Sequence, residues 1–202
     1  MPPKIIDLKK TEDPRDVVHL AVQALAESRA VVFPTETDYV IAVAARRDGV
    51  GQVTGLAVSR EREPLLSLAV KSADEALDWA PRLTGFAQRI ARRCWPGPVT
   101  ILVDDDHPES LVHRLPEASR QAVVGQGRLR LRVPGHPLLG DCLRMLDGPV
   151  ALVEPAPAGA GIPVTAEECL QRCDDRVALV LDDGRTRYAE SSTTIAADEH
   201  SF

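Results

Sequence analysis

The feature of this 202-residue chain that most restricts its fold is the alternation of short apolar runs with helix-like segments. Runs rich in Val, Ile, Leu and Ala are typical of buried strands, and the segments between them repeat their apolar residues every three or four positions. The expected strands are residues 4–8, 30–33, 40–45, 66–70, 99–103, 129–133, 150–153, 178–181 and 188–195. The expected helices are residues 14–28, 51–59, 72–79, 84–94, 136–146 and 165–172. This interleaving predicts one α/β domain, a sheet with helices on its faces.

Capping residues mark where several of these helices begin. Asp13 and Pro14 predict a helix whose apolar face consists of Val17, Leu20, Ala21, Ala24, Leu25 and Ser28. Ser72 with Glu75, and Thr165 with Glu168, have the spacing of capping boxes. These residues predict where three of the helices begin.

Composition excludes several classes of protein. The 30 acidic residues exceed the 24 Lys and Arg, which gives a net charge of -6 and argues against nucleic-acid binding by bulk charge, although a local basic cleft is compatible with it. Two Trp, two Tyr and three Phe are too few for a base-stacking platform. No apolar run reaches membrane-spanning length, and the first residues lack the apolar region of a signal peptide. We therefore expect a cytoplasmic protein that does not enter membranes.

The four cysteines do not form a metal-binding pattern. Cys169 and Cys173 lie four residues apart on an expected helix, so a two-ligand site is conceivable. No second cysteine pair and no nearby histidine complete it, which favours buried thiols and no metal site.

Three polar motifs lie at the ends of expected strands. The first is Val-Val-Phe-Pro-Thr-Glu-Thr-Asp-Tyr at residues 31–39, and the second is Cys-Trp-Pro-Gly-Pro-Val-Thr at residues 94–100. The third is Arg-Leu-Arg-Val-Pro-Gly-His-Pro at residues 130–137. In this order and at these intervals, and with residues 149–153 and 192–195 in register, the chain resembles the YrdC-like family over about residues 12–197.

The resemblance implies a fold and a reaction. The fold is a twisted mixed sheet with flanking helices around a concave basic groove, formed by residues 12–197 with terminal extensions at 1–11 and 198–202. Active members of the family are threonylcarbamoyl-AMP synthases, nucleotidyltransferases that join L-threonine, bicarbonate and ATP for the modification of adenosine 37 in tRNA. ATP and Mg²⁺ would then be required, because charge develops on the phosphates as pyrophosphate leaves.

The same resemblance assigns binding residues. Those expected at the amino-acid substrate are Thr35, Thr37, Tyr39, Arg132, Ser192 and Thr193. Arg132 is expected to bind the substrate carboxylate, because a guanidinium binds carboxylates through two parallel hydrogen bonds. Without the resemblance, a threonine-rich turn is the favoured interpretation of Thr35 and Thr37, and Ser192 and Thr193 are typical of an ordinary β-branched strand.

The residues expected at the nucleotide are Arg60, Arg62, Thr100, Glu154 and Arg187. Here the chain departs from the family pattern, with Val58 in place of a lysine, Glu154 in place of a serine and Ala156 in place of an asparagine. A glutamate beside a triphosphate is repulsive, so this pattern predicts weak ATP binding.

The residues leave other interpretations open. Arg60 and Arg62 are also compatible with a solvated helix end, and Arg128 and Arg130 with the exposed face of an edge strand. His136 is expected to cap the following helix or to line the cleft. Besides a synthase, the alternatives are a non-catalytic member that binds tRNA, double-stranded RNA or a nucleotide, and a paralogue that binds a small carboxylate through Arg132. Oligomeric state is not predicted.

Overall fold

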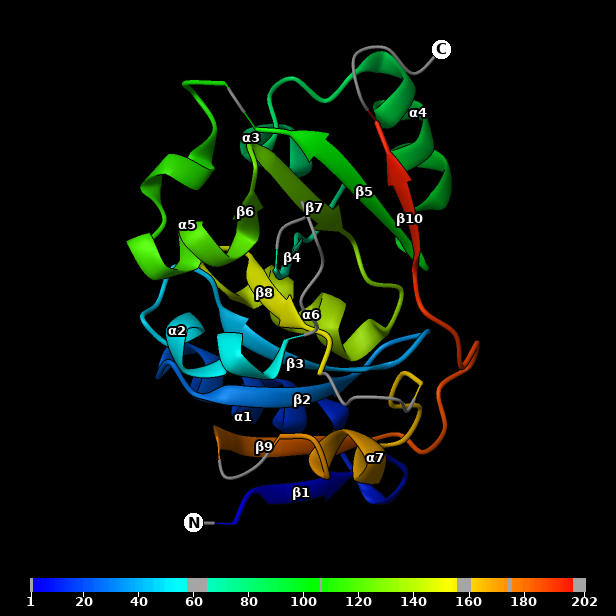
Figure 1. Cartoon of the computed structure of the whole chain (residues 1–202). Helices are drawn as coiled ribbons and strands as arrows, with labels where there is room; N and C mark the ends of the chain where they lie inside the picture. The colour runs from blue at the N-terminus through cyan, green and yellow to red at the C-terminus, as the bar shows by residue number, and fades with distance from the viewer. Residues whose placement is uncertain (1, 58–64, 106, 156–160, 174–175, 198–202) are drawn as a thin grey trace.

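The computed structural model describes residues 2–57, 65–105, 107–155, 161–173 and 176–197, and its centre is one mixed sheet (Figure 1). The strands are β1 (Lys4–Asp7), β2 (Ala30–Pro34), β3 (Tyr39–Ala44), β4 (Ser67–Ala69), β5 (Val99–Asp104), β6 (Val124–Gly125), β7 (Arg128–Arg132), β8 (Val150–Val153), β9 (Val177–Asp182) and β10 (Thr193–Ala196). Their order across the sheet is β1-β9-β2-β3-β8-β4-β7-β5-β10, and β6 pairs with β7 outside this path.

The sheet combines both strand directions. β9 runs parallel to both β1 and β2, and β10 runs parallel to β5, whereas β2 and β3 form an antiparallel hairpin and β7 pairs antiparallel with β5. This arrangement confirms the expected mixed α/β sheet. The domain limits of 12 and 197 stay a prediction, and β1, which precedes residue 12, pairs with β9 as an edge strand of the sheet.

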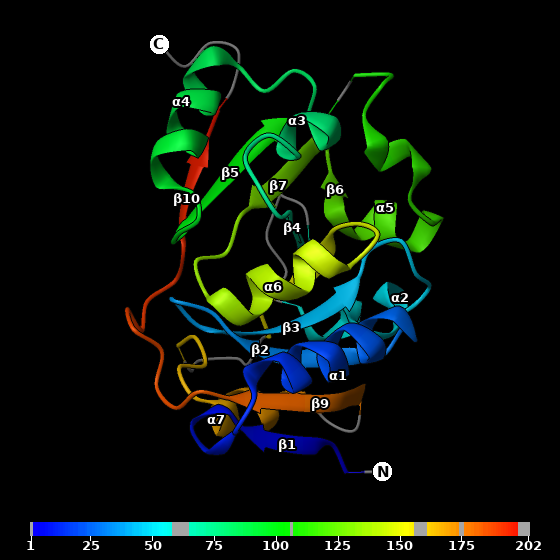
Figure 2. The same ribbon diagram turned by 180° about the vertical axis from the view of Figure 1, so that it is seen from behind.

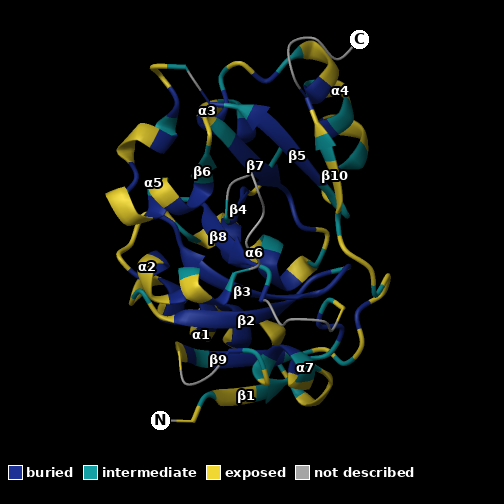
Figure 3. Ribbon diagram, in the orientation of Figure 1, coloured by how far each residue is buried: buried dark blue, intermediate teal, exposed yellow. Residues whose placement is uncertain are grey.

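Helices cover both faces of the sheet. They are α1 (Pro14–Ala26), α2 (Val50–Val53), α3 (Ala76–Trp79), α4 (Gly85–Cys94), α5 (Glu117–Val123), α6 (Pro137–Met145) and α7 (Ala166–Leu170), with short 3-10 turns at Leu8–Lys10, Thr54–Leu56 and Leu111–Arg114. α1 and α6 pack together on one face, as Figure 2 shows from behind, and the other described helices pack on the opposite face. Two apolar layers result, and the central strands between them are buried (Figure 3).

The first helix begins as predicted, but its buried face is rotated. Asp13 accepts the backbone N–H of Arg15, and Pro14 is the first helical residue. Leu20, predicted to be buried, is 39% exposed, whereas Val18 is buried. The reason is α6, which packs beside α1 and places Cys142 Sγ 4.0 Å from the Val18 carbonyl oxygen. The helix therefore faces α6 as well as the sheet.

Other expected elements differ in length. The last strand was expected over 188–195, but only Thr193–Ala196 pairs, because the preceding residues cross from β9 to the far edge of the sheet. α2 is a single turn, and α5 was not expected at all. Within the part of the chain that the structure describes, no helix has the length and apolar character needed to span a bilayer.

Candidate functional site

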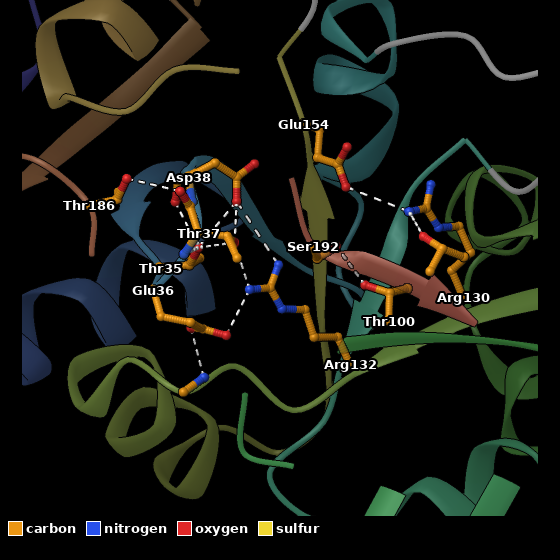
Figure 4. Close-up of polar contacts among 12 residues, drawn as sticks. Thr35, Glu36, Thr37, Asp38, Thr100, Arg130, Arg132, Glu154, Thr186 and Ser192 are labelled. Atoms are coloured by element: carbon orange, nitrogen blue, oxygen red, sulfur yellow. Dashed lines mark hydrogen bonds and ion pairs between the residues drawn. The ribbon is translucent and has the colours of Figure 1, made fainter. Parts of the chain in front are cut away.

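The loop between β2 and β3 meets the end of β7 and brings together residues from the first and third motifs. We call Thr35, Glu36, Thr37, Asp38 and Arg132 the arginine–threonine cluster (Figure 4). Arg132 ends β7, where it pairs with Thr100 of β5 and Ala69 of β4. Because opposed residues in a sheet point to the same face, Arg132 lies on the face covered by α1 and α6.

Arg132 is held by the protein's own acceptors. One terminal nitrogen (Nη2) donates to Glu36 Oε1 and to Thr37 Oγ1, both at 2.8 Å, and the other (Nη1) lies 4.0 Å from Asp38 Oδ1. Its side chain is only 3% exposed. A substrate carboxylate that binds Arg132 must therefore replace or share the contact with Glu36.

The two threonines fix the shape of the loop. Thr35 Oγ1 donates to the Asp38 carbonyl oxygen at 2.7 Å and accepts the backbone N–H groups of Thr37 and Asp38. Thr37 Oγ1 donates to Asp38 Oδ1 at 2.7 Å, and Thr186 Oγ1 donates to the Thr37 carbonyl oxygen at 2.9 Å. All four residues are buried. The loop is therefore preorganised by side-chain hydrogen bonds that join it to the segment after β9.

Asp38 is a buried carboxyl group in an unfavourable electrostatic position. Burial and the negative charge of Glu154 raise the pKa of Asp38 from 3.8 to about 6, although Arg132 and the hydroxyl of Thr37 oppose the rise. This group changes its ionisation close to neutral pH, so the charge of the cluster is sensitive to pH.

A second arginine lies on the same strand. Arg130 Nη2 is 3.7 Å from Glu154 Oε1, just after β8, and donates to Thr194 Oγ1 of β10 at 3.2 Å. The side chain of Arg130 is 2% exposed and that of Glu154 is 17% exposed. The interpretation of Arg130 as an exposed edge residue is therefore wrong, because β7 lies between β4 and β5. Arg128 is partly buried, 3.8 Å from Asp104.

The remaining predicted residues lie around this centre. Thr100 Oγ1 and Ser192 Oγ are 3.0 Å apart, and Thr193 is exposed at the start of β10. Tyr39 is buried, and its hydroxyl donates to the Gly184 carbonyl oxygen at 2.7 Å and accepts the Asp183 N–H at 3.0 Å. Burial raises the Tyr39 pKa, and the negative charges of Asp182 and Asp183 add to the rise, although the hydrogen bond from the Asp183 N–H opposes it.

Some predicted nucleotide-binding residues are separate from the cluster or cannot be placed. Arg187 is exposed, and its guanidinium lies over the Tyr188 ring, 5.3 Å from the ring centre. Arg60, Arg62, Val58 and Ala156 lie outside the described residues. His136 occupies the N-cap position of α6, one of its two expected places, but its side chain makes no capping hydrogen bond there; it also lines a cavity.

The cluster does not form a resident metal site. Glu36 and Glu154 each lie within 4 Å of an arginine, and Asp38 lies at that distance from Arg132. A divalent cation would have to displace these guanidinium groups. Across the residues that the structure describes, no three His, Cys, Asp or Glu side chains are grouped as metal ligands. Mg²⁺ thus stays a prediction tied to the phosphates of ATP.

Glu36 and Asp38 were missed as functional candidates by the sequence analysis. Both stand in the four-residue connection, residues 35–38, between two strands that consist of buried residues. Charged side chains so close to a buried hairpin need partners, and this requirement was the available signal. The identity of the partner, Arg132, depends on a contact between residues 96 positions apart.

Comparison with known proteins identifies the family of this chain. The family model for the Sua5/YciO/YrdC domain, described as "Telomere recombination", matches residues 23–202. The chain belongs to this family. A threonylcarbamoyl-AMP synthase of Pyrococcus abyssi is 24% identical over 182 residues, covering 90% of this chain and 51% of the relative. One of Bacillus subtilis is 26% identical over 192 residues, covering 95% and 53%. This Sua5/YciO/YrdC chain thus spans about half the length of these curated relatives.

Solved structures of the family share the fold. P. abyssi Sua5 complexed with L-threonine has a TM-score of 0.77 at 21% identity, covering 98% of this chain and 54% of that chain. Escherichia coli YciO has a TM-score of 0.75 at 18% identity, covering 98% and 91%. The expected YrdC-like architecture is confirmed, and at these identities the likeness concerns the fold alone.

Proposed function

We propose that this Sua5/YciO/YrdC-family protein is a threonylcarbamoyl-AMP synthase-like protein that binds L-threonine at the arginine–threonine cluster and binds ATP weakly. The observation that carries the proposal is the meeting of Arg132 with Thr37 at 2.8 Å, next to Thr35. A buried guanidinium beside two hydroxyls offers donors for a carboxylate and partners for a small hydroxylated side chain. The structure of P. abyssi Sua5 complexed with L-threonine supports the choice of ligand.

The nucleotide half of the proposal depends on Glu154. Its carboxylate follows β8 and raises the Asp38 pKa, so the two acidic groups influence each other within the site. A phosphate about 4 Å from such a carboxylate meets a repulsion on the order of 4 kcal/mol at an effective dielectric of 20. We therefore expect the wild-type protein to bind ATP and Mg²⁺ weakly and to release little pyrophosphate.

Calorimetry tests the amino-acid half. We expect L-threonine to bind the wild type, and Arg132→Lys to weaken this binding by about 1.5–3 kcal/mol, because lysine keeps the charge and loses the planar donor pair. Arg120→Ala, which removes an exposed arginine paired with Glu117, is the matched control and leaves the affinity unchanged. Equal affinity in a folded Arg132→Lys protein refutes the assignment.

Turnover and RNA binding separate the remaining possibilities. We measure the release of pyrophosphate from ATP that depends on threonine and bicarbonate. A rate comparable to that of an active synthase contradicts the prediction that Glu154 weakens ATP binding. If the proposal is right, Glu154→Ser combined with Ala156→Asn strengthens ATP binding. Salt-sensitive tRNA binding without threonine binding supports the non-catalytic alternative instead.

A further inference from the structure

A cavity of about 510 Å³ lies outside the arginine–threonine cluster, between α1, α6 and the loop after β9. Arg132, Asp38 and Glu154 are not among its lining residues, and only Thr35 and Glu36 of the cluster reach it. Its volume falls in the range of small-molecule sites in proteins. The proposed L-threonine site does not account for it.

Much of the wall is apolar. Leu8, Pro14, Val18, Pro34 and Leu138 line the cavity, together with the Tyr39 ring, whose hydroxyl is already engaged with backbone groups. Such a wall favours a ligand with an apolar body, since transferring that body from water is favourable by about 25 cal/mol for each Å² of apolar surface.

The acceptors on the wall are already in use. Glu36 accepts from Arg132 through one oxygen and from the Gly135 backbone N–H, at 2.9 Å, through the other. Asp141 pairs with Arg144, and Asp183 Oδ2 lies 3.3 Å from His136 Nε2. These carboxylates are therefore poorly available to a cationic ligand.

The donors are not used in the same way. Arg185 and Arg187 line the cavity from the loop after β9, and within the described part of the chain neither makes an ion pair with a carboxylate. A wall with occupied acceptors and available donors is complementary to a negatively charged group.

We propose that this cavity binds a small organic anion, an apolar or aromatic body that carries one phosphate or carboxylate group. Arg185 and Arg187 bind the charged group, and the apolar wall contacts the body. The proposal is independent of the L-threonine site, because Glu36 and its hydrogen bonds separate the cavity from Arg132.

Titration of the full chain with four probes tests both parts of the proposal. The probes are phenyl phosphate, benzoate, inorganic phosphate and the neutral benzyl alcohol. We expect phenyl phosphate or benzoate to bind at least ten times more tightly than benzyl alcohol and than inorganic phosphate. The tighter of the two aromatic anions identifies the charged group. Equal binding of the alcohol or of inorganic phosphate, or no binding of either aromatic anion at millimolar concentration, overturns the proposal.

Two variants locate the binding. The double variant Arg185→Ala with Arg187→Ala binds the aromatic anion at least ten times more weakly than wild type does. Both residues are exposed, so the substitutions leave the fold intact. Arg120→Ala, the matched loss of an exposed arginine, has no effect. L-threonine affinity is unchanged in the double variant, so failure here is distinguishable from failure of the proposed function. An unchanged anion affinity in the double variant places the binding elsewhere and refutes the assignment.

Discussion

Replacement of Asp38 by asparagine is expected to stabilise the protein at neutral pH. The buried carboxylate is disfavoured by desolvation and by Glu154, which raises its pKa from 3.8 to about 6. At 1.36 kcal/mol for each pH unit, this rise corresponds to about 3 kcal/mol of unfavourable free energy for the ionised group in the folded state. Asparagine has nearly the same shape and can still accept hydrogen bonds from the hydroxyls of Thr35 and Thr37.

The effect has a defined pH window. Between about pH 4 and pH 6 the folded protein keeps a proton on Asp38 that the unfolded chain has lost, so the contribution of this group to stability falls as the pH rises. Above pH 6 the group is ionised in both states and the full cost is present. Asp38→Asn removes the cost, so its advantage over wild type is small at pH 4 and about 2–3 kcal/mol at pH 7.5.

Urea denaturation of both proteins at pH 4.5, 6 and 7.5 measures this difference. Asp74→Asn, at an exposed position without an ion pair among the described residues, is the matched control and leaves the stability within about 0.5 kcal/mol of wild type. An Asp38→Asn protein that is less stable than wild type at pH 7.5, or equally affected at every pH, refutes the reasoning.

Three further changes probe the same region. Glu154→Gln removes the second cause of the raised Asp38 pKa, so the Asp38 titration followed by carboxyl NMR moves to lower pH; no movement contradicts the electrostatic account. Glu36→Ala takes the nearest carboxylate from buried Arg132 and costs about 3 kcal/mol in urea denaturation, whereas Glu36→Gln costs less. Tyr39→Phe leaves two backbone groups without their partner and costs about 1–3 kcal/mol in thermal or urea unfolding; a neutral result places water at those groups.

The strands were predictable because their signal is local. Val150–Val153 and Val99–Asp104 are apolar runs of strand length, and the start of α1 is encoded by Asp13 and Pro14. The rotated face of α1 was not predictable in the same way. Burial of Val18 depends on α6, more than a hundred residues later in the chain.

In the functional site, too, some features follow from the local sequence and others depend on contacts between distant residues. Arg130 and Arg132 are two residues apart on β7 and so point to one face, but their burial depends on β7 being an inner strand. A strand's position in a sheet is not encoded in its own residues. The resemblance pointed to Thr35, Thr37 and Arg132, and the fold brings these residues together. It gave no indication that Glu36 forms an ion pair with the Arg132 guanidinium.

The position of β9 has a consequence for folding. β9 (Val177–Asp182) lies between β1 and β2, so the strand nearest the N-terminus joins the sheet only after more than 170 further residues are available. Loop closure over such separations is slow, and structures with many long-range pairings fold slowly for this reason. During synthesis the apolar edge of β2 stays unpaired on one side until β9 emerges, and an unpaired edge is a template for pairing with other chains. We therefore expect the yield of soluble protein to depend on chaperones and on the growth temperature. The stability of the protein once folded does not determine this yield.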